Sequence, residues 1–160
     1  MRRDVTVRRG ALSDYEALGV VFDEAEEYHR TALPQIFREP DDRFPSRTLF
    51  DSWVRADDAE VFVAAHVGEL VGFTAVQHSQ TLEADALRSR KLAVVGLLAV
   101  RSSARRLGAG RAMMEATKEW AAERGLDAVS LTVWEFNASA IEFYEAIGFR
   151  TLSRTMEHPV

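Results

Sequence analysis

The stretch Arg105-Arg106-Leu107-Gly108-Ala109-Gly110 is the most informative part of this chain. It follows an almost wholly apolar run at residues 91–100 and precedes a segment with apolar residues at helical spacing. The first N–H groups of a helix have no partner within the helix and carry about half a positive charge. Glycines let a ligand approach these amides closely, and the arginines beside them add charge. The stretch therefore predicts a phosphate-binding helix N-terminus.

The segments on either side of this stretch indicate alternating strands and helices. Residues 91–100 are typical of a strand buried on both faces, and residues 128–133 of a second, β-branched strand. Helical spacing predicts one helix from residue 109 to about Gly125 and a last helix at residues 140–147. This order of elements is typical of an α/β fold.

The N-terminal half adds shorter elements around a proline-rich loop. Alternation predicts a strand at residues 5–8, and Ser13 and Glu16 have the spacing of a capping box before a helix. Three prolines make residues 31–47 a loop with at most one short helix at residues 35–38. The other expected elements are a helix at 49–55, strands at 60–66 and 69–77 joined by a Val67-Gly68 turn, a polar connector at 82–90 and a last strand at 149–158.

Composition narrows the class of protein. A chain of 160 residues with 47% hydrophobic residues is expected to form one domain over residues 1–160. The absence of cysteine and of any ligand spacing among 4 histidines predicts no metal site. A net charge of -5 argues against nucleic acid as a partner. The N-terminus, Met1-Arg2-Arg3-Asp4-Val5, lacks the apolar core of a signal peptide and no run is long enough to cross a membrane, so we expect a cytoplasmic protein.

Three features in this order carry a family resemblance. They are the buried strand at 91–100, the Arg-x-x-Gly-x-Gly turn at 105–110, and Asn137-x-x-Ala140-x-x-x-Tyr144 followed by Gly148-Phe149. Over about residues 91–149 the chain resembles the GNAT superfamily of acetyl-CoA-dependent N-acetyltransferases. The resemblance implies an α/β GNAT (acyl-CoA N-acyltransferase) fold, with a mixed central sheet of about six to seven strands and about four helices. Because this fold often pairs, the resemblance also implies a homodimer as a possible assembly of this chain.

The resemblance implies roles for residues of this region. The strand end Leu98-Ala99-Val100 is expected to splay from residues 131–133 and to pair with the pantetheine arm of acetyl-CoA, the cosubstrate. The amides of residues 106–111 are expected to hold its pyrophosphate, while Asn137 contacts its amide arm and Tyr144 faces its thioester sulfur. The implied cofactor-binding residues are Leu98, Ala99, Val100, Arg105, Arg106, Leu107, Gly108, Ala109, Gly110, Arg111, Asn137, Ala140 and Tyr144.

Acetyl transfer to an amine requires three groups from the protein. A backbone N–H near Leu98 is expected to stabilise the oxyanion, and the Tyr144 phenol to protonate the departing thiolate. Leu98 and Tyr144 are therefore the predicted catalytic residues. Many relatives carry an acidic residue as general base just before the Leu-Ala-Val segment, where this chain has Val95-Gly96-Leu97. The remaining candidates for the base are water, Glu83, Asp85, Glu135, His78 and His29.

Two hypotheses for function follow. The first is an N-acetyltransferase acting on a primary amine of a small molecule, peptide or protein, by direct attack on acetyl-CoA. The resemblance implies that the acceptor pocket includes the region of Tyr28, His29, Leu33-Pro34 and Phe37. The alternative is a non-catalytic acyl-CoA-binding sensor or regulatory module, which the missing strand acid favours. A nucleotide-binding domain is disfavoured, because the chain lacks both the P-loop ending and the Gly-x-Gly-x-x-Gly pattern.

Overall fold

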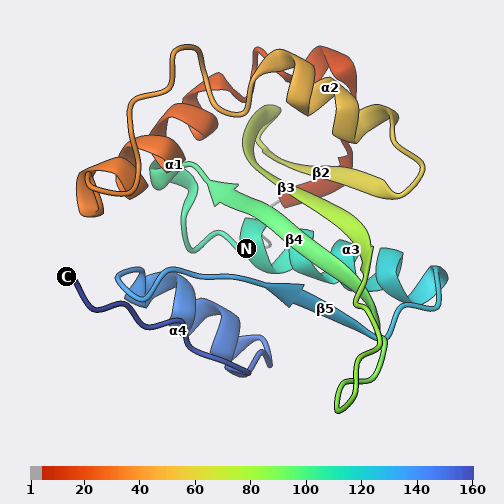
Figure 1. Ribbon diagram of the computed structural model, residues 1–160. Helices are drawn as coiled ribbons and strands as arrows, with labels where there is room; N and C mark the ends of the chain where they lie inside the picture. The colour runs from red at the N-terminus through yellow and green to blue at the C-terminus, as the bar shows by residue number, and fades with distance from the viewer. Residues whose placement is uncertain (1–4) are drawn as a thin grey trace.

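The computed structural model describes residues 5–160 as one mixed sheet with helices on both faces (Figure 1). The expectation of no signal peptide falls largely on Met1-Arg2-Arg3-Asp4, which lies outside the described residues. The sheet has the order β1-β2-β3-β4-β5, with antiparallel pairing up to β4 and parallel pairing between β4 and β5. Its strands are β1 (Val5–Arg9), β2 (Ala59–His66), β3 (Glu69–Gln80), β4 (Lys91–Val100) and β5 (Ala128–Leu131).

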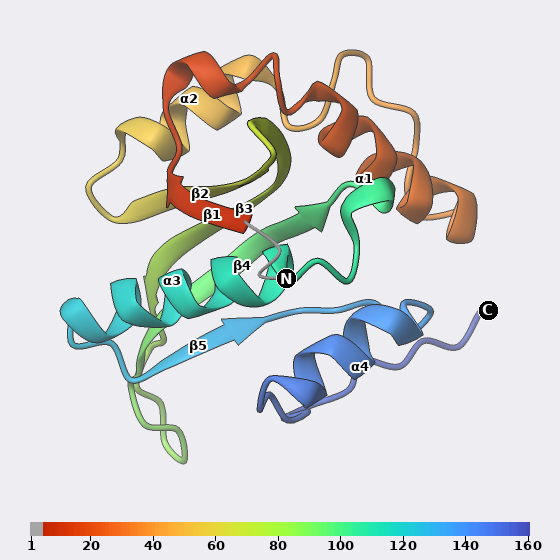
Figure 2. The ribbon, with the colours of Figure 1, turned by 180° about the vertical axis from the view of Figure 1, so that it is seen from behind.

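Two helices cover each face of the sheet. Figures 1 and 2 show the molecule from opposite sides, with α1 (Gly19–Ala32) and α2 (Arg47–Arg55) above the sheet. Helix α3 (Ala109–Glu123) crosses the face turned to the viewer in Figure 2, and α4 (Ala138–Ala146) lies beyond β5. The α/β class and the layers expected from the sequence are thus confirmed. No helix within residues 5–160 is long and apolar enough to cross a membrane.

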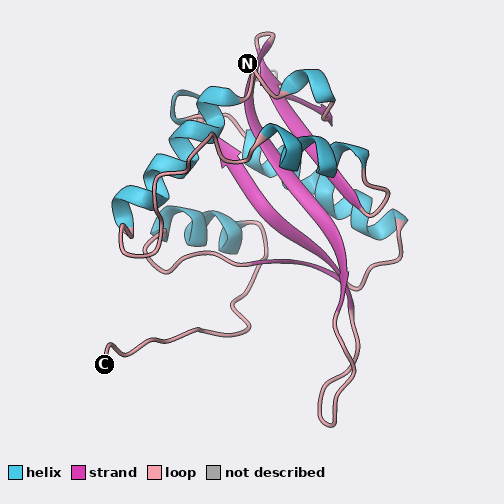
Figure 3. Ribbon diagram, turned by 45° about the horizontal axis from the view of Figure 1, so that its top comes forward, coloured by secondary structure: helices cyan, strands magenta, loops and turns pink. Residues whose placement is uncertain are grey.

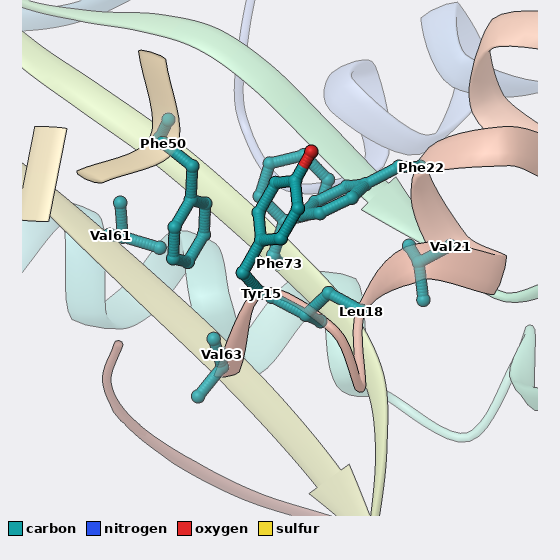
Figure 4. Packing of buried hydrophobic residues seen from close by; sticks show 9 residues of the cluster. Tyr15, Leu18, Val21, Phe22, Phe50, Val61, Val63 and Phe73 are labelled. Atoms are coloured by element: carbon teal, nitrogen blue, oxygen red, sulfur yellow. The ribbon is translucent and has the colours of Figure 1, made fainter. Parts of the chain in front are cut away.

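The faces of the sheet have separate cores. On the α1/α2 face, Phe22, Phe50 and Phe73 pack around Tyr15, whose ring lies 5.5 Å from both Phe22 and Phe50 (Figure 4). On the α3/α4 face, the fully buried side chains include Met113, Met114 and Trp120. Burial of such side chains is the main favourable contribution to folding.

The predicted hairpin between β2 and β3 is confirmed. His66 pairs with Glu69, and the two turn residues Val67 and Gly68 have φ of 51° and 81°. Two positive φ values are the signature of a type I′ turn, whose twist matches that of the flanking strands. The connector at residues 81–90 forms a second loop, which projects from the body of the molecule (Figure 3).

The strand count and the C-terminal strand were predicted wrongly. The described residues form five strands rather than six to seven, and residues 149–158 form none. Strand β5 ends at Leu131 instead of residue 133. Residues 151–160 are exposed throughout, with Leu152 71% and Met156 89% accessible. Without a buried face, β-branched residues alone do not hold a strand in place.

The expected capping box at Ser13 is also wrong. Ser13 lies inside a short 3-10 turn, η1 (Leu12–Asp14), and α1 begins later, at Gly19. Buried Asp14 organises this corner instead, because it accepts hydrogen bonds from Arg8 (2.8 Å) and from the backbone N–H of Ala11 (2.7 Å). These bonds, led by the one from Arg8, lower the pKa of Asp14. The short helix allowed at residues 35–38 is absent, and residues 34–36 form a turn instead.

Candidate active site

Strands β4 and β5 separate part of the way along their length. Their parallel pairing runs from Leu92–Ala128 to Val95–Leu131 and stops there, although β4 continues to Val100. Beyond this point the backbone groups of β4 on the β5 side are not used by the sheet. Unpaired strand backbone can hydrogen-bond an extended ligand as a further strand would. The splay expected at Leu98-Ala99-Val100 is therefore present.

A β-bulge marks the point of separation. Ala75 pairs with Leu97 and Val76 with Val95, so Gly96 is the extra residue on β4. Buried Thr74 fixes the bulge, since its hydroxyl donates to the carbonyl of Leu97 at 2.8 Å. A Cβ at Gly96 would have no atom within 4 Å. Gly96, one of the three residues Val95-Gly96-Leu97 that stand where the family resemblance implies a strand acid, thus adjoins open space.

A cavity of about 610 Å³ opens where the strands separate. One wall comes from β4, β5 and α4, and the other from α1 and the proline-rich loop that follows it. The lining residues of the first wall include Leu97, Leu98, Ala99, Leu131, Thr132, Val133, Asn137, Ala140 and Tyr144. Five residues predicted to bind the cofactor, Leu98, Ala99, Asn137, Ala140 and Tyr144, therefore meet on one wall although they come from two elements, β4 and α4 with its N-cap.

Tyr144 lies between the core and the cavity. Its ring contacts Phe143 and Phe149 at 5.2 and 5.6 Å between centroids, and the residue also lines the cavity. Burial raises the pKa of the Tyr144 hydroxyl to about 12. A phenol with this pKa keeps its proton throughout the neutral range, as a proton donor must.

Asn137 combines a structural contact with a place on the cavity wall. Its side-chain oxygen accepts a hydrogen bond from the backbone N–H of Ala140 (3.2 Å), so Asn137 caps the N-terminus of α4. The same oxygen also accepts a hydrogen bond from the hydroxyl of Ser139 (3.4 Å). Since these contacts use the oxygen, the amide NH₂ is the group that remains for a ligand in the cavity.

The glycine-rich turn forms an open helix N-terminus next to this wall. Gly108 caps α3 with φ of 94°, no side chain caps the first turn, and that turn holds no acidic residue. A Cβ at Gly110 would lie 3.2 Å from Phe143, so α3 and α4 approach closely here. The first turn of α3 thus has neither a side-chain cap nor a carboxylate, and the binding of an anion there stays a prediction.

The basic residues of the turn are exposed, and its backbone is strained. Arg105, Arg106 and Arg111 are all exposed, and Arg106 has φ of 63°, which non-glycine residues rarely adopt. Such strain tends to occur where a ligand is bound. Val100 and residues 105–111 lie outside the cavity lining, and Leu107 packs against the core cluster around Met113.

On the opposite wall, His29 lines the cavity, and one of its ring nitrogens is already engaged by the backbone. Its Nδ1 lies 2.8 Å from the carbonyl oxygen of Ala25, which can only accept, so Nδ1 carries the hydrogen. In the neutral ring Nε2 then has the lone pair. Phe37 and Phe136 contact the ring at 5.4 and 5.6 Å between centroids and fix its orientation.

Of the five residues considered as general base, His29 alone lines this cavity among the described residues. Glu83 and Asp85 are exposed on the projecting loop, and exposed Glu135 pairs with Arg154 at 3.1 Å. His78 lines a separate hollow of about 340 Å³ beside Trp53. The described residues contain no group of three or more side chains that could hold a metal ion.

Several lining residues were not predicted. Phe37 was expected from the resemblance, whereas Ile36, Phe44, Phe73 and Glu26 were not. Phe44 follows a run of charged residues and resembles any loop aromatic, so no local signal distinguishes it. Tyr28, Leu33 and Pro34, expected at the pocket, lie outside its lining.

Comparison with known proteins gives a family and a fold. The model of the acetyltransferase (GNAT) family matches residues 22–149. Mycothiol acetyltransferase from Thermobispora bispora is 37% identical over 94 residues, which cover 58% of this chain but only 30% of that protein. The chain thus spans about a third of the length of this curated relative.

Solved structures share the whole architecture. A point mutant of the BH1408 protein from Bacillus halodurans has a TM-score of 0.91 at 26% identity, covering 97% of this chain and 99% of that one. An aminoglycoside acetyltransferase, HMB0005, from an uncultured soil metagenomic sample has a TM-score of 0.69 at 20% identity, covering 98% and 99%. The second likeness concerns the fold alone.

Proposed function

Because the chain belongs to the acetyltransferase (GNAT) family and is therefore an acyltransferase, we propose that it transfers the acetyl group of acetyl-CoA to a primary amine by direct attack. The observation that carries the proposal is the cavity in which the open side of β4, Tyr144 and His29 meet. The open N-terminus of α3 beside it supports binding of the CoA pyrophosphate.

When bound, acetyl-CoA supplies an acyl group activated as a thioester. A backbone N–H near Leu98, on the unpaired part of β4, is the proposed hydrogen-bond donor to the carbonyl oxygen. His29 Nε2 is the proposed acceptor of the amine proton. In this role His29 takes the place of the acid that the resemblance implies within residues 95–97. The Tyr144 hydroxyl, held protonated by its raised pKa, is the proposed donor to the leaving sulfur.

The acceptor is proposed to be a small molecule. The first wall of the cavity is assigned to the acyl-CoA arm. The space that remains between α1 and Trp134 is therefore proposed to hold a small amine. The names of mycothiol acetyltransferase and the aminoglycoside acetyltransferase indicate small-molecule acceptors for those proteins.

Amine-dependent release of thiol from acetyl-CoA tests this proposal, with an amine-free control. Tyr144→Phe is expected to lower kcat by about 10²-fold without weakening acetyl-CoA binding, because only the proton donor is lost. Tyr28→Phe, which removes a hydroxyl outside the cavity, is the matched control and should retain full activity. Thiol release by the unchanged protein should not decline between pH 8 and pH 10 through Tyr144, since a pKa raised to about 12 keeps the phenol protonated there.

Two results would contradict the proposal. Full activity of Tyr144→Phe would remove Tyr144 from the mechanism. Tight binding of acetyl-CoA with no thiol release for any amine would instead support a non-catalytic acyl-CoA-binding module.

A further inference from the structure

The wall of the cavity that faces away from β4 and β5 is a surface for the acceptor. It comes from α1 and from residues 36–45, together with Trp134 from the loop after β5. Acetyl-CoA is assigned to the other wall under the proposed function, on which this inference rests. The side chains of this acceptor wall therefore determine which amines can enter.

The acceptor wall is apolar and accessible. Ile36, Phe44 and Trp134 are 49%, 44% and 39% exposed, although all three are large apolar residues that line the cavity. Phe37 packs edge-on between His29 and Trp134, with centroid distances of 5.4 and 5.2 Å. Covering exposed apolar surface of this kind with an apolar ligand lowers the free energy of the complex, and aromatic rings in edge-on contact can also pack against an aryl group of the ligand.

The charges on the lining are already paired. Its charged side chains within the described chain are those of Glu26 and Arg38. Glu26 lies 3.3 Å from Arg30, which also lies 3.3 Å from the exposed Glu39, and Arg38 lies 3.1 Å from Asp41. A second ammonium group on an acceptor would therefore have to compete with Arg30 for Glu26 while losing its own hydration, which is unfavourable.

We propose that the acceptor is a primary monoamine carried on an apolar, aryl-sized body, and that polycationic amines are excluded. The reacting amine reaches His29 at the side of the aromatic wall, and the body of the acceptor covers Phe37, Phe44 and Trp134. Such a monoamine differs from an aminoglycoside, the acceptor named for the acetyltransferase HMB0005 that shares the fold.

A matched pair of amines tests the proposal on the full chain. 4-Methylbenzylamine and 4-(aminomethyl)benzylamine have similar size and differ by one ammonium group. We expect kcat/KM for the monoamine to exceed that for the diamine, per reactive amine, by about tenfold or more. Spermidine and the aminoglycoside kanamycin should react more slowly still. Equal or faster reaction of the diamine, spermidine or kanamycin would overturn the proposal.

Two further measurements separate this inference from the proposed function. Calorimetric binding of the same two amines to the unchanged protein saturated with CoA, which carries no acetyl group, measures selectivity without turnover, so equal affinities would overturn the inference even if acetyl transfer occurs. Phe44→Asp places a carboxylate at an exposed position of the acceptor wall, and we expect it to lower the ratio of kcat/KM for the monoamine to kcat/KM for the diamine by about tenfold. Phe44→Leu should leave this ratio unchanged. An unchanged preference in Phe44→Asp would contradict the assigned wall.

Discussion

At the scale of single residues, His29 has its function set by one hydrogen bond. The contact between Nδ1 and the Ala25 carbonyl leaves the lone pair of the neutral ring on Nε2, and His29 is a residue of the cavity lining. Across the cavity, β4 has Val95-Gly96-Leu97 where the family resemblance implies an acid, and Gly96 adjoins open space. One missing carboxylate and one oriented imidazole thus suggest that proton removal has moved from the sheet to α1.

His29→Gln tests this assignment. The amide cannot take up a proton, so we expect kcat to fall by about 10²-fold while acetyl-CoA affinity stays unchanged. The residual rate should increase with pH toward the pKa of the free amine, because only amine deprotonated in solution can then react. A purely structural role for His29 would not produce this new pH dependence. His66→Gln, at the end of β2 and outside the cavity, is the control.

At the scale of elements, the β2–β3 hairpin contains a residue that does not suit its turn. Val67 is β-branched, has φ of 51° and is 81% exposed, so it bears strain without contributing burial. Val67→Asn places a residue that tolerates this conformation before Gly68, and we expect it to raise the free energy of unfolding by about 0.5–1 kcal/mol. Thermal unfolding measures the change, with Val67→Ala as the control that keeps the strain. A lower melting temperature for Val67→Asn would contradict the turn assignment.

The N-terminus of α3 allows a matched test of anion binding. Gly108 and Gly125 flank the same helix, both have positive φ, and a Cβ at either meets no atom within 4 Å. Gly108→Glu and Gly125→Glu therefore carry a similar backbone cost of about 1–2 kcal/mol. Only Gly108→Glu adds negative charge beside the open amides, so we expect it to weaken CoA binding by about tenfold or more. Equal CoA affinities in the two variants would contradict the pyrophosphate assignment.

Elements with strong local signals were predictable, and those set by distant contacts were not. The apolar run of β4 and the glycines around α3 predicted the positions of both elements, whereas the splay of β4 from β5 was implied by the family resemblance. The acceptor wall depends on Phe37 meeting Trp134, two residues far apart in the sequence, and no periodicity shows such a contact. Ser13 had the right spacing for a cap, but Asp14 formed stronger, charge-assisted bonds with Arg8.

At the scale of the whole molecule, we expect each face of the sheet to support the binding of a different one of the two proposed substrates. The Phe50 cluster lies beneath α1 and reaches the acceptor wall through Phe22, which lines the cavity. The Met113 cluster lies beneath the glycine-rich turn, in contact with Leu107 and Val100. The sheet separates these cores, so damage to one should affect the binding of one substrate more than the other.

Phe50→Leu and Met113→Leu test this division. Both residues are fully buried, and each change should lower the free energy of unfolding by about 1–2 kcal/mol. We expect Phe50→Leu to raise KM for the amine by about 2- to 30-fold, the range of indirect coupling, with little effect on the Kd of acetyl-CoA. Met113→Leu should do the reverse, because it loosens the support of the open amides of α3. Equal effects of either variant on both substrates would show that the sheet transmits the disturbance instead of separating the two halves.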